Sequence, residues 1–165
     1  MNNFLELINI RKSFTTEKNI NVLRGLSKKF KPGKTYAIMG PSGSGKSTLL
    51  NLISLIDKPT SGTIKFDNLE INFNQNEKND LIRAKKLGIV YQENNLLSDF
   101  TALENVYFAS LSLNNDKKLA LSKAEKLLKK IGLSNRLNHF PSQLSGGEAQ
   151  RVAIARAIVN VPQII

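Results

Sequence analysis

Residues 40–48 read Gly40-Pro-Ser-Gly-Ser-Gly-Lys-Ser-Thr48, which matches the pattern Gly-x-x-x-x-Gly-Lys-Ser/Thr. The five residues before this stretch, 35–39, form a short apolar run. The residues after it place leucine and isoleucine at helical spacing as far as Ile56. We therefore predict a buried parallel strand over 35–39, a glycine-rich loop, and a helix from about Gly45 to Ile56. This strand–loop–helix unit favours an α/β fold.

Each residue type in this loop has a chemical reason to be there. Glycines let backbone N–H groups approach an anion closely, and the N-terminus of the following helix adds a positive dipole. Lys46 is expected to reach terminal phosphates, and the Ser47 hydroxyl to bind Mg²⁺. A flexible Gly/Ser linker is the alternative, and the flanking strand and helix disfavour it. The sequence thus predicts binding of a nucleoside triphosphate by Gly40, Pro41, Ser42, Gly43, Ser44, Gly45, Lys46, Ser47 and Thr48.

The composition excludes several other classes of protein. The 165 residues are 41% hydrophobic and 22% charged, which predicts a buried core rather than wholesale disorder. The chain has no cysteine and one histidine, which excludes disulfides and multi-histidine metal sites. We find no apolar run long enough to span a membrane and no secretory signal, which fits the cytoplasmic side. The net charge of +11 comes mostly from lysine and favours a solvated surface over a nucleic-acid site.

The rest of the first half is expected to contain short strands and loops. Residues 4–30 alternate in two runs, which predicts two extended segments joined by a polar turn at 15–19. In the first run we expect Ile8 and Ile10 on one face, and Leu5 and Leu7 on the other. Further along we expect strands at 63–66, 70–73 and 87–91, and a polar loop at 74–79.

The pattern becomes helical beyond residue 94. Thr101 and Glu104 form a Ser/Thr-x-x-Glu capping box, which predicts the start of a helix. Apolar residues at helical spacing between 120 and 131 predict a second helix, which Gly132 terminates. Ser145 and Glu148 form another capping box, which opens a helix expected over 147–159.

The stretch 144–157 reads LSGGEAQRVAIARA and resembles the signature sequence of ATP-binding-cassette (ABC) ATPases. Taken alone, Ser-Gly-Gly-Glu indicates only a capped helix N-terminus that exposes N–H groups toward an anion. The length of the match, about a hundred residues after the glycine-rich loop, makes the resemblance specific. It implies an α/β P-loop NTPase core with an N-terminal antiparallel β-subdomain and a helical signature subdomain, incomplete at the C-terminus. The implied divisions are 1–93, 94–146 and 147–165.

The resemblance also implies roles for particular residues. Phe14 stands where the family places an aromatic that stacks on adenine, and a core phenylalanine is the alternative. Gln92 matches a glutamine that helps to hold Mg²⁺ and links the nucleotide site to the helical subdomain; the alternative is a polar strand end. Two copies are expected to pair head to tail, so that each ATP contacts a second copy's signature residues, Ser145, Gly146, Gly147 and Glu148. Lys46 and Gln92 are the expected catalytic residues.

The family continues beyond the signature helix with an apolar strand, an Asp for Mg²⁺ and a Glu that polarises water. The sequence ends at Ile165, inside the expected strand. We therefore expect the full-length parent to hydrolyse ATP and residues 1–165 alone not to do so. A stop codon directly after Ile165 would instead indicate a pseudogene or a non-catalytic ATP-binding regulator.

Residues 94–106 resemble the corresponding stretch of lipoprotein-releasing (Lol-type) ATP-binding subunits, although Ser98 stands where proline is expected. This resemblance implies docking on integral membrane subunits, peripherally on the cytoplasmic face of the inner membrane, with 94–110 as the expected contact. Macrolide-exporter-type and cell-division-type subunits are alternatives. A soluble DNA-associated ABC ATPase is a further one, but the span from Thr48 to Leu144 holds no long coiled coil. No nucleic-acid partner is expected.

Overall fold

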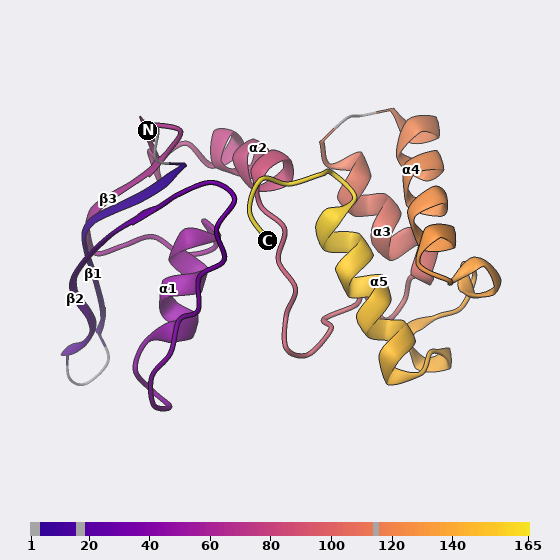
Figure 1. Ribbon diagram of the computed structural model, residues 1–165, viewed down its shortest axis with the longest axis horizontal. Helices are drawn as coiled ribbons and strands as arrows, with labels where there is room; N and C mark the ends of the chain where they lie inside the picture. The colour runs from indigo at the N-terminus through magenta and orange to yellow at the C-terminus, as the bar shows by residue number, and fades with distance from the viewer. Residues whose placement is uncertain (1–3, 16–18, 114–115) are drawn as a thin grey trace. The chain divides into compact units, whose positions relative to one another are not determined.

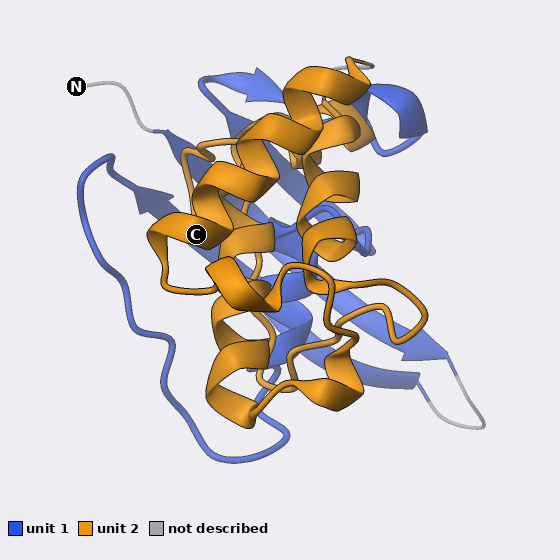
Figure 2. Cartoon of the chain, turned by 90° about the vertical axis from the view of Figure 1, so that its right-hand side faces the viewer, with its two compact units in different colours: residues 1–79 blue, residues 80–165 orange. Residues whose placement is uncertain are grey.

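The computed structural model describes residues 4–15, 19–113 and 116–165 (Figure 1). These fall into two compact units, Met1–Asn79 (unit 1) and Asp80–Ile165 (unit 2), which Figure 2 colours separately. The middle of the turn expected at 15–19 lies outside the described residues. Within the described residues, no helix combines the length and the apolar character that a membrane span requires.

Unit 1 contains an antiparallel sheet, which confirms the prediction for residues 4–30. The strands lie in the order β2-β1-β3-β4, and β1 pairs with both β2 and β3. Leu5 is paired with Phe30 on one side and with Phe66 on the other. The strand expected at 70–73 is shorter and earlier, at β4. The four strands are β1 (Leu5–Thr15), β2 (Asn19–Phe30), β3 (Ser61–Phe66) and β4 (Leu69–Glu70).

A bulge in β1 changes which side chains share a face. Asn9 has φ +48°, and the pairing of β1 shifts between Leu7 and Ile10. An extra residue in a strand reverses the alternation beyond it, so Ile10 is buried on the same side as Leu7, while Ile8 is 36% exposed. The prediction that grouped Ile8 with Ile10 is therefore wrong. The same shift places Lys12 among the buried residues.

The helix after the glycine-rich loop is α1 (Lys46–Ile53), shorter than expected, and it buries Leu49, Leu52 and Ile53. The strand predicted over 35–39 does not form, and this segment is largely exposed. A buried parallel strand needs hydrogen-bonded neighbours, and none of the described residues pairs with this one. Instead, Tyr36 packs edge-on against Phe30, with ring centroids 4.9 Å apart.

The prediction of a polar loop at 74–79 is wrong, because α2 (Asn76–Lys86) begins within this segment and continues into unit 2. Its sequence contains few apolar residues, which hides the helical period. Glu77 in the first turn and three basic residues in the last turn suit the helix dipole. The strand expected at 87–91 is also absent, and only one parallel bridge, from Leu87 to Ile164, is present there.

The core of unit 2 lies among the helices α3 (Ala102–Leu111), α4 (Lys117–Lys130) and α5 (Gly146–Ile158), and α3 and α5 start at the predicted caps. Thr101 and Ser145 each accept a hydrogen bond from the backbone N–H three residues later and complete a capping box, as predicted. The helix expected to end at Gly132 ends at Lys130. The common core of these helices consists of Ala102, Val106, Ala124, Leu128, Leu133, Val152, Ala155 and Val159.

Candidate functional site

The glycine-rich loop of unit 1 ends at Gly45, which caps α1 with φ +88°. A Cβ added there would lie 2.8 Å from Cγ1 of Val22 in β2, so both the backbone conformation and the space require glycine. No side chain caps the helix, and no acidic residue occupies its first turn. The N–H groups and the positive end of the dipole therefore remain available to an anion.

Lys46 reaches back over the loop that precedes it. Its Nζ donates hydrogen bonds to the carbonyl oxygens of Gly40, at 2.9 Å, and Pro41, at 2.8 Å. Phosphate oxygens would be stronger acceptors for an ammonium than these neutral carbonyls. Ser47 is exposed in the first turn beside Lys46. Its hydroxyl is the kind of hard oxygen ligand that Mg²⁺ takes together with phosphate oxygens, so this part of the loop fits the ion.

Phe14 lies near the end of β1, in the same unit as the loop, and is 42% exposed. Lys12 places its Nζ 4.9 Å from the centroid of the Phe14 ring. An aromatic ring with this much exposed surface is able to stack on a planar ligand.

The signature residues form the exposed N-terminus of α5 in unit 2. Gly146 and Gly147 do not have a positive φ. A Cβ added at Gly146 would meet nothing within 4 Å, and one at Gly147 would meet only Nη1 of Arg151, at 3.8 Å. The described structure gives no steric or conformational reason for these two glycines. A group from outside the described residues that approached this helix end closely would supply a steric reason for the two glycines.

Glu148 is held at the same helix end. Backbone hydrogen bonding to Ser145, then the side chain of Arg136, and then the Ser145 hydroxyl lower the pKa of Glu148 from 4.5 to about 2. The carboxylate accepts a hydrogen bond from the Ser145 N–H at 2.8 Å. Arg136 Nε lies 2.7 Å from the other oxygen. The negative charge is thus compensated by a fixed cation, and it opposes an incoming anion less than a free carboxylate would.

Gln92 is an exposed residue of unit 2, just before a segment that Arg156 of α5 holds. The guanidinium donates to the carbonyl oxygen of Asn94, at 2.8 Å, and to that of Asn95, at 2.6 Å. Sequence reasoning missed Arg156, although there was a signal. It follows the buried Val152 by four residues and so lies on the same side of α5 as that valine.

The candidate residues are thus distributed over both units. Unit 1 contains Phe14 and residues 40–48, and unit 2 contains Gln92 and residues 145–148. Comparison with known proteins bears on this combination. The family model described as ABC transporter matches residues 23–165. The chain belongs to the ABC transporter family. The prediction of an ABC ATPase fold is confirmed.

Two similar proteins carry the name lipoprotein-releasing system ATP-binding protein LolD. The protein from Saccharophagus degradans is 45% identical over 98% of this chain and 71% of its own length. The protein from Wigglesworthia glossinidia brevipalpis is 45% identical over all of this chain and 73% of its own length. These matches confirm the resemblance to the lipoprotein-releasing members of the ABC transporter family.

Solved structures of the ATP-binding cassette MJ0796 are also similar to this chain. One is a dimer in a post-hydrolysis state with ADP and Pi, with a TM-score of 0.86 and 40% identity. A second dimeric structure of the same bacterial ABC transporter cassette matches equally well. Each match covers 96% of this ABC transporter chain and 70% of the other. The family is one of ATP-binding ATPases, and these neighbours are dimeric.

Proposed function

We propose that this chain is the ATP-binding subunit of an ABC transporter that couples ATP binding and hydrolysis to the release of lipoproteins from the inner membrane. The observation that carries the proposal is the 45% identity to a lipoprotein-releasing system ATP-binding protein over 98% of the chain. The geometry of loop 40–48 supports the ATP-binding part, because an uncapped helix N-terminus and one ammonium converge there.

In the proposed nucleotide site, backbone N–H groups of residues 40–48 hold the phosphates, and Lys46 exchanges its carbonyl partners for the terminal phosphate oxygens. Ser47 and Gln92 are the proposed Mg²⁺ ligands, and the ion would neutralise phosphate charge when bound. Phe14 stacks on the adenine. The exposure of Phe14 and Ser47 supports these roles, since both side chains are accessible to a ligand.

The proposed second contact to ATP comes from another copy of the chain. Ser145, Gly146, Gly147 and Glu148 would close over the phosphates held by the partner's loop, so that ATP joins the two subunits. No atom of the described residues lies within 4 Å of a Cβ added at Gly146, which leaves room for a partner molecule and supports this role, and so do the dimeric neighbours. A second helix N-terminus facing the phosphates would add charge stabilisation that one loop cannot supply.

We further propose that residues 1–165 by themselves bind ATP without measurable hydrolysis. Hydrolysis requires an oriented water as well as phosphate stabilisation. Residues 149–165 contain no aspartate or glutamate and so provide no carboxylate to activate water. Lys46 and Gln92, which both lie within residues 1–165, remain the proposed catalytic side chains.

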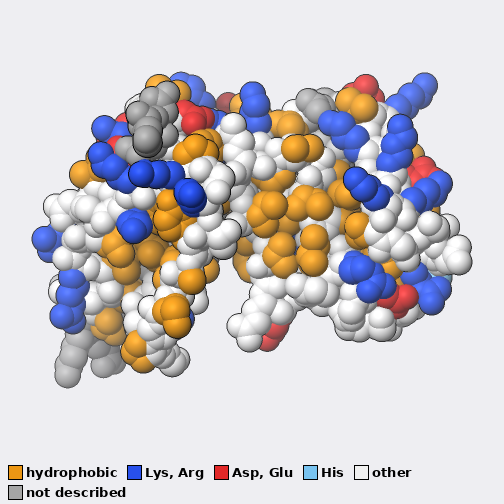
Figure 3. All heavy atoms as spheres, in the orientation of Figure 1, with side chains coloured by type: hydrophobic (Ala, Val, Ile, Leu, Met, Phe, Trp, Pro, Cys, Tyr) orange, Lys and Arg blue, Asp and Glu red, His pale blue; other side chains and the backbone are white. Residues whose placement is uncertain are grey.

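The proposed contact with the integral membrane subunits is the segment 94–110, on the cytoplasmic face of the inner membrane. Phe100 and Phe108 are each 37% exposed and pack edge to face, with centroids 4.9 Å apart. Leu97 is 47% exposed in the same segment. Figure 3 shows the lysine and arginine side chains of unit 2 spread over the visible face rather than gathered in one stripe. This favours a protein partner over nucleic acid.

Titration of the chain with ATP and Mg²⁺ tests the nucleotide site. We expect Lys46→Met to weaken ATP binding at least tenfold, and Lys34→Met, a lysine outside the loop, to leave it unchanged. Equal affinity in the wild type and Lys46→Met would refute the assigned role of the loop.

A binding assay with membrane subunits tests the transport assignment. Detergent-solubilised membrane proteins of a lipoprotein-releasing, a macrolide-exporting and a cell-division system are offered in turn to the immobilised chain. Retention of the first alone is the expected result, and Phe108→Ala should weaken it. Preferential retention of either other set would replace lipoprotein release by that alternative. Salt-sensitive retention of duplex DNA instead would favour the DNA-associated alternative.

A further inference from the structure

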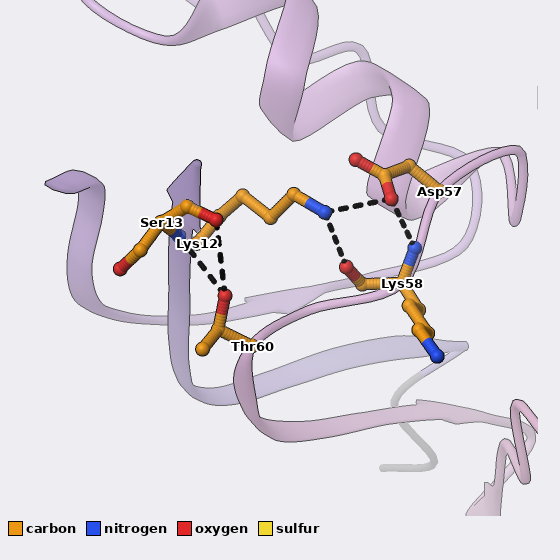
Figure 4. A network of polar contacts seen from close by, with 5 residues as sticks. All are labelled: Lys12, Ser13, Asp57, Lys58 and Thr60. Carbon is orange, nitrogen blue, oxygen red and sulfur yellow. Dashed lines mark hydrogen bonds and ion pairs between the residues drawn. The ribbon is translucent and has the colours of Figure 1, made fainter. Parts of the chain in front are cut away.

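Lys12 is a buried lysine in the strand that carries Phe14, and it belongs to a polar network within unit 1 (Figure 4). Its Nζ donates to Oδ1 of Asp57 at 2.7 Å and to the carbonyl oxygen of Lys58 at 2.9 Å. The same carboxylate oxygen accepts the Lys58 N–H at 2.7 Å. The ammonium therefore has fixed partners in the segment that follows α1.

A second set of hydrogen bonds joins the same two segments. The Thr60 N–H donates to the carbonyl oxygen of Arg11 at 2.9 Å, and the Ser13 N–H donates to the Thr60 hydroxyl at 3.0 Å. The Asp57 N–H, in turn, donates to the carbonyl oxygen of Asn51 in α1 at 3.2 Å. The end of β1 is thus connected through residues 57–60 to the helix that starts at the glycine-rich loop.

Lys12 also contacts the ring that follows it on the strand. Its Nζ lies 4.9 Å from the Phe14 centroid, within the range of a cation–π interaction. Lysine normally keeps its ammonium in water. Here the ammonium is drawn inward by Asp57 and beneath an aromatic side chain that stays 42% exposed.

We propose that the Lys12–Asp57 pair positions Phe14 for the adenine base, so that the base as well as the triphosphate contributes to recognition. The proposal rests on the proposed function, in which loop 40–48 holds the phosphates and Phe14 stacks on adenine. Lys12 is a positioning residue, since it acts through Phe14. The pair sets the orientation of the ring, and residues 57–60 set its place relative to α1.

The test compares two ligands of the same loop, ATP and inorganic tripolyphosphate, each with Mg²⁺. We expect Lys12→Met to weaken ATP binding about fivefold and to leave tripolyphosphate binding within twofold of the wild type. Phe14→Ala should have the same pattern, and the double variant should bind ATP no more weakly than Phe14→Ala alone. Lys12→Arg retains the cation and should retain most of the ATP affinity.

The matched control is Lys29→Met. Lys29 pairs with Glu6 at 2.9 Å in the same sheet, but its side chain is 61% exposed, and it should affect neither ligand. Asp57→Asn serves as a second variant that keeps the lysine and loosens its anchor. It should weaken ATP binding more than tripolyphosphate binding. This variant keeps the proposal testable if Lys12→Met fails to fold.

The possible failures are distinguishable. If the wild type binds neither ligand, or if Phe14→Ala binds ATP as the wild type does, the proposed function of these residues is wrong, and the positioning proposal is overturned with it. If Phe14→Ala selectively loses ATP affinity while Lys12→Met and Asp57→Asn do not, the positioning proposal alone is overturned. Equal losses for both ligands in Lys12→Met would mark a general structural role and would overturn it as well.

Discussion

Arg136 Nε lies 2.7 Å from Oε1 of Glu148, and this ion pair ties the 3-10 helix Ser134–Arg136 to the first turn of α5. The carboxylate also accepts the Ser145 N–H, so one side chain serves the cap and the ion pair together. Glu148 is therefore occupied inside unit 2. In the proposed dimer this pairing would hold the helix end in place while residues 145–148 approach the partner's nucleotide.

The depressed pKa of Glu148 predicts a specific dependence of stability on pH. Its folded-state pKa of about 2 lies below the ordinary value of 4.5, so the ionised form stabilises the folded state above pH 4.5. That contribution declines as the pH falls from 4.5 toward 2. We expect the difference in free energy of unfolding between the wild type and Glu148→Gln to shrink over this range, as measured by urea titration.

A control variant and a second measurement accompany the urea titration. Glu125→Gln removes one charge from an exposed pair with Lys129, away from the cap. A nuclear magnetic resonance titration of the Glu148 carboxyl should give a midpoint well below 4.5. A midpoint at the ordinary value, or a constant difference between wild type and variant from pH 7 to pH 3, would contradict the prediction.

Gly146→Ala separates folding from association. Because an added Cβ meets nothing and φ is not positive, the free energy of unfolding should stay within ~1 kcal/mol of the wild type or rise slightly. We expect self-association with ATP and Mg²⁺, followed by sedimentation velocity, to weaken at least tenfold. Unchanged association would count against a contact between Gly146 and the partner's nucleotide.

Local sequence patterns predicted the glycine-rich loop followed by a helix, and the N-terminal caps of α3 and α5. The loop 40–48 is defined by a spacing of residues, and the caps at Thr101 and Ser145 involve residues only three positions apart. Such patterns depend on neighbours in the sequence. The strand over 35–39 depends instead on hydrogen bonds to strands distant in sequence, and the described residues supply none. The apolar run at 35–39 was therefore not sufficient evidence for a strand.

The contacts that position the candidate site were harder to predict. Lys12 is buried because the bulge at Asn9 reverses the strand face, and a positive φ at asparagine has no reliable sequence signal. Its partner Asp57 is distant in sequence. The helix α2 was missed for another reason: its mostly polar sequence has no apolar stripe from which to read a period.

Asn105 organises the proposed docking segment, so its substitution should destabilise unit 2. Its buried side chain donates to the carbonyl oxygens of Leu97, Phe100 and Thr101, and accepts the Leu97 N–H at 2.8 Å. Removing these partners leaves buried polar groups unpaired. We expect Asn105→Ala to lower the free energy of unfolding by about 1–3 kcal/mol. Urea unfolding followed by circular dichroism measures this.

The matched control is Asn135→Ala, an exposed asparagine of the same unit, which should cost little. Asn105→Ala should also weaken retention of the membrane subunits. Normal retention by a measurably destabilised variant would show that residues 97–101 are not part of the docking contact. Asp99→Lys is a cleaner probe of charge than a change at Glu104, because Glu104 accepts two hydrogen bonds from Thr101 in the cap.

We expect Arg156 to hold the segment after Gln92 in its conformation. Its guanidinium is partly buried and bonds to two backbone carbonyl oxygens, those of Asn94 and Asn95. Asn95 has φ +46°, in the left-handed region that asparagine adopts more readily than most residues. We expect Arg156→Met to speed amide hydrogen exchange across residues 93–97 severalfold, measured by mass spectrometry, while exchange in the middle of α4 stays unchanged. Arg151→Met, an exposed arginine of the same helix, should leave both regions as in the wild type. If residues 93–97 exchanged their amide hydrogens equally slowly in both variants, the segment would owe its conformation to contacts other than Arg156. Gln92 would then not be coupled to α5 through this side chain.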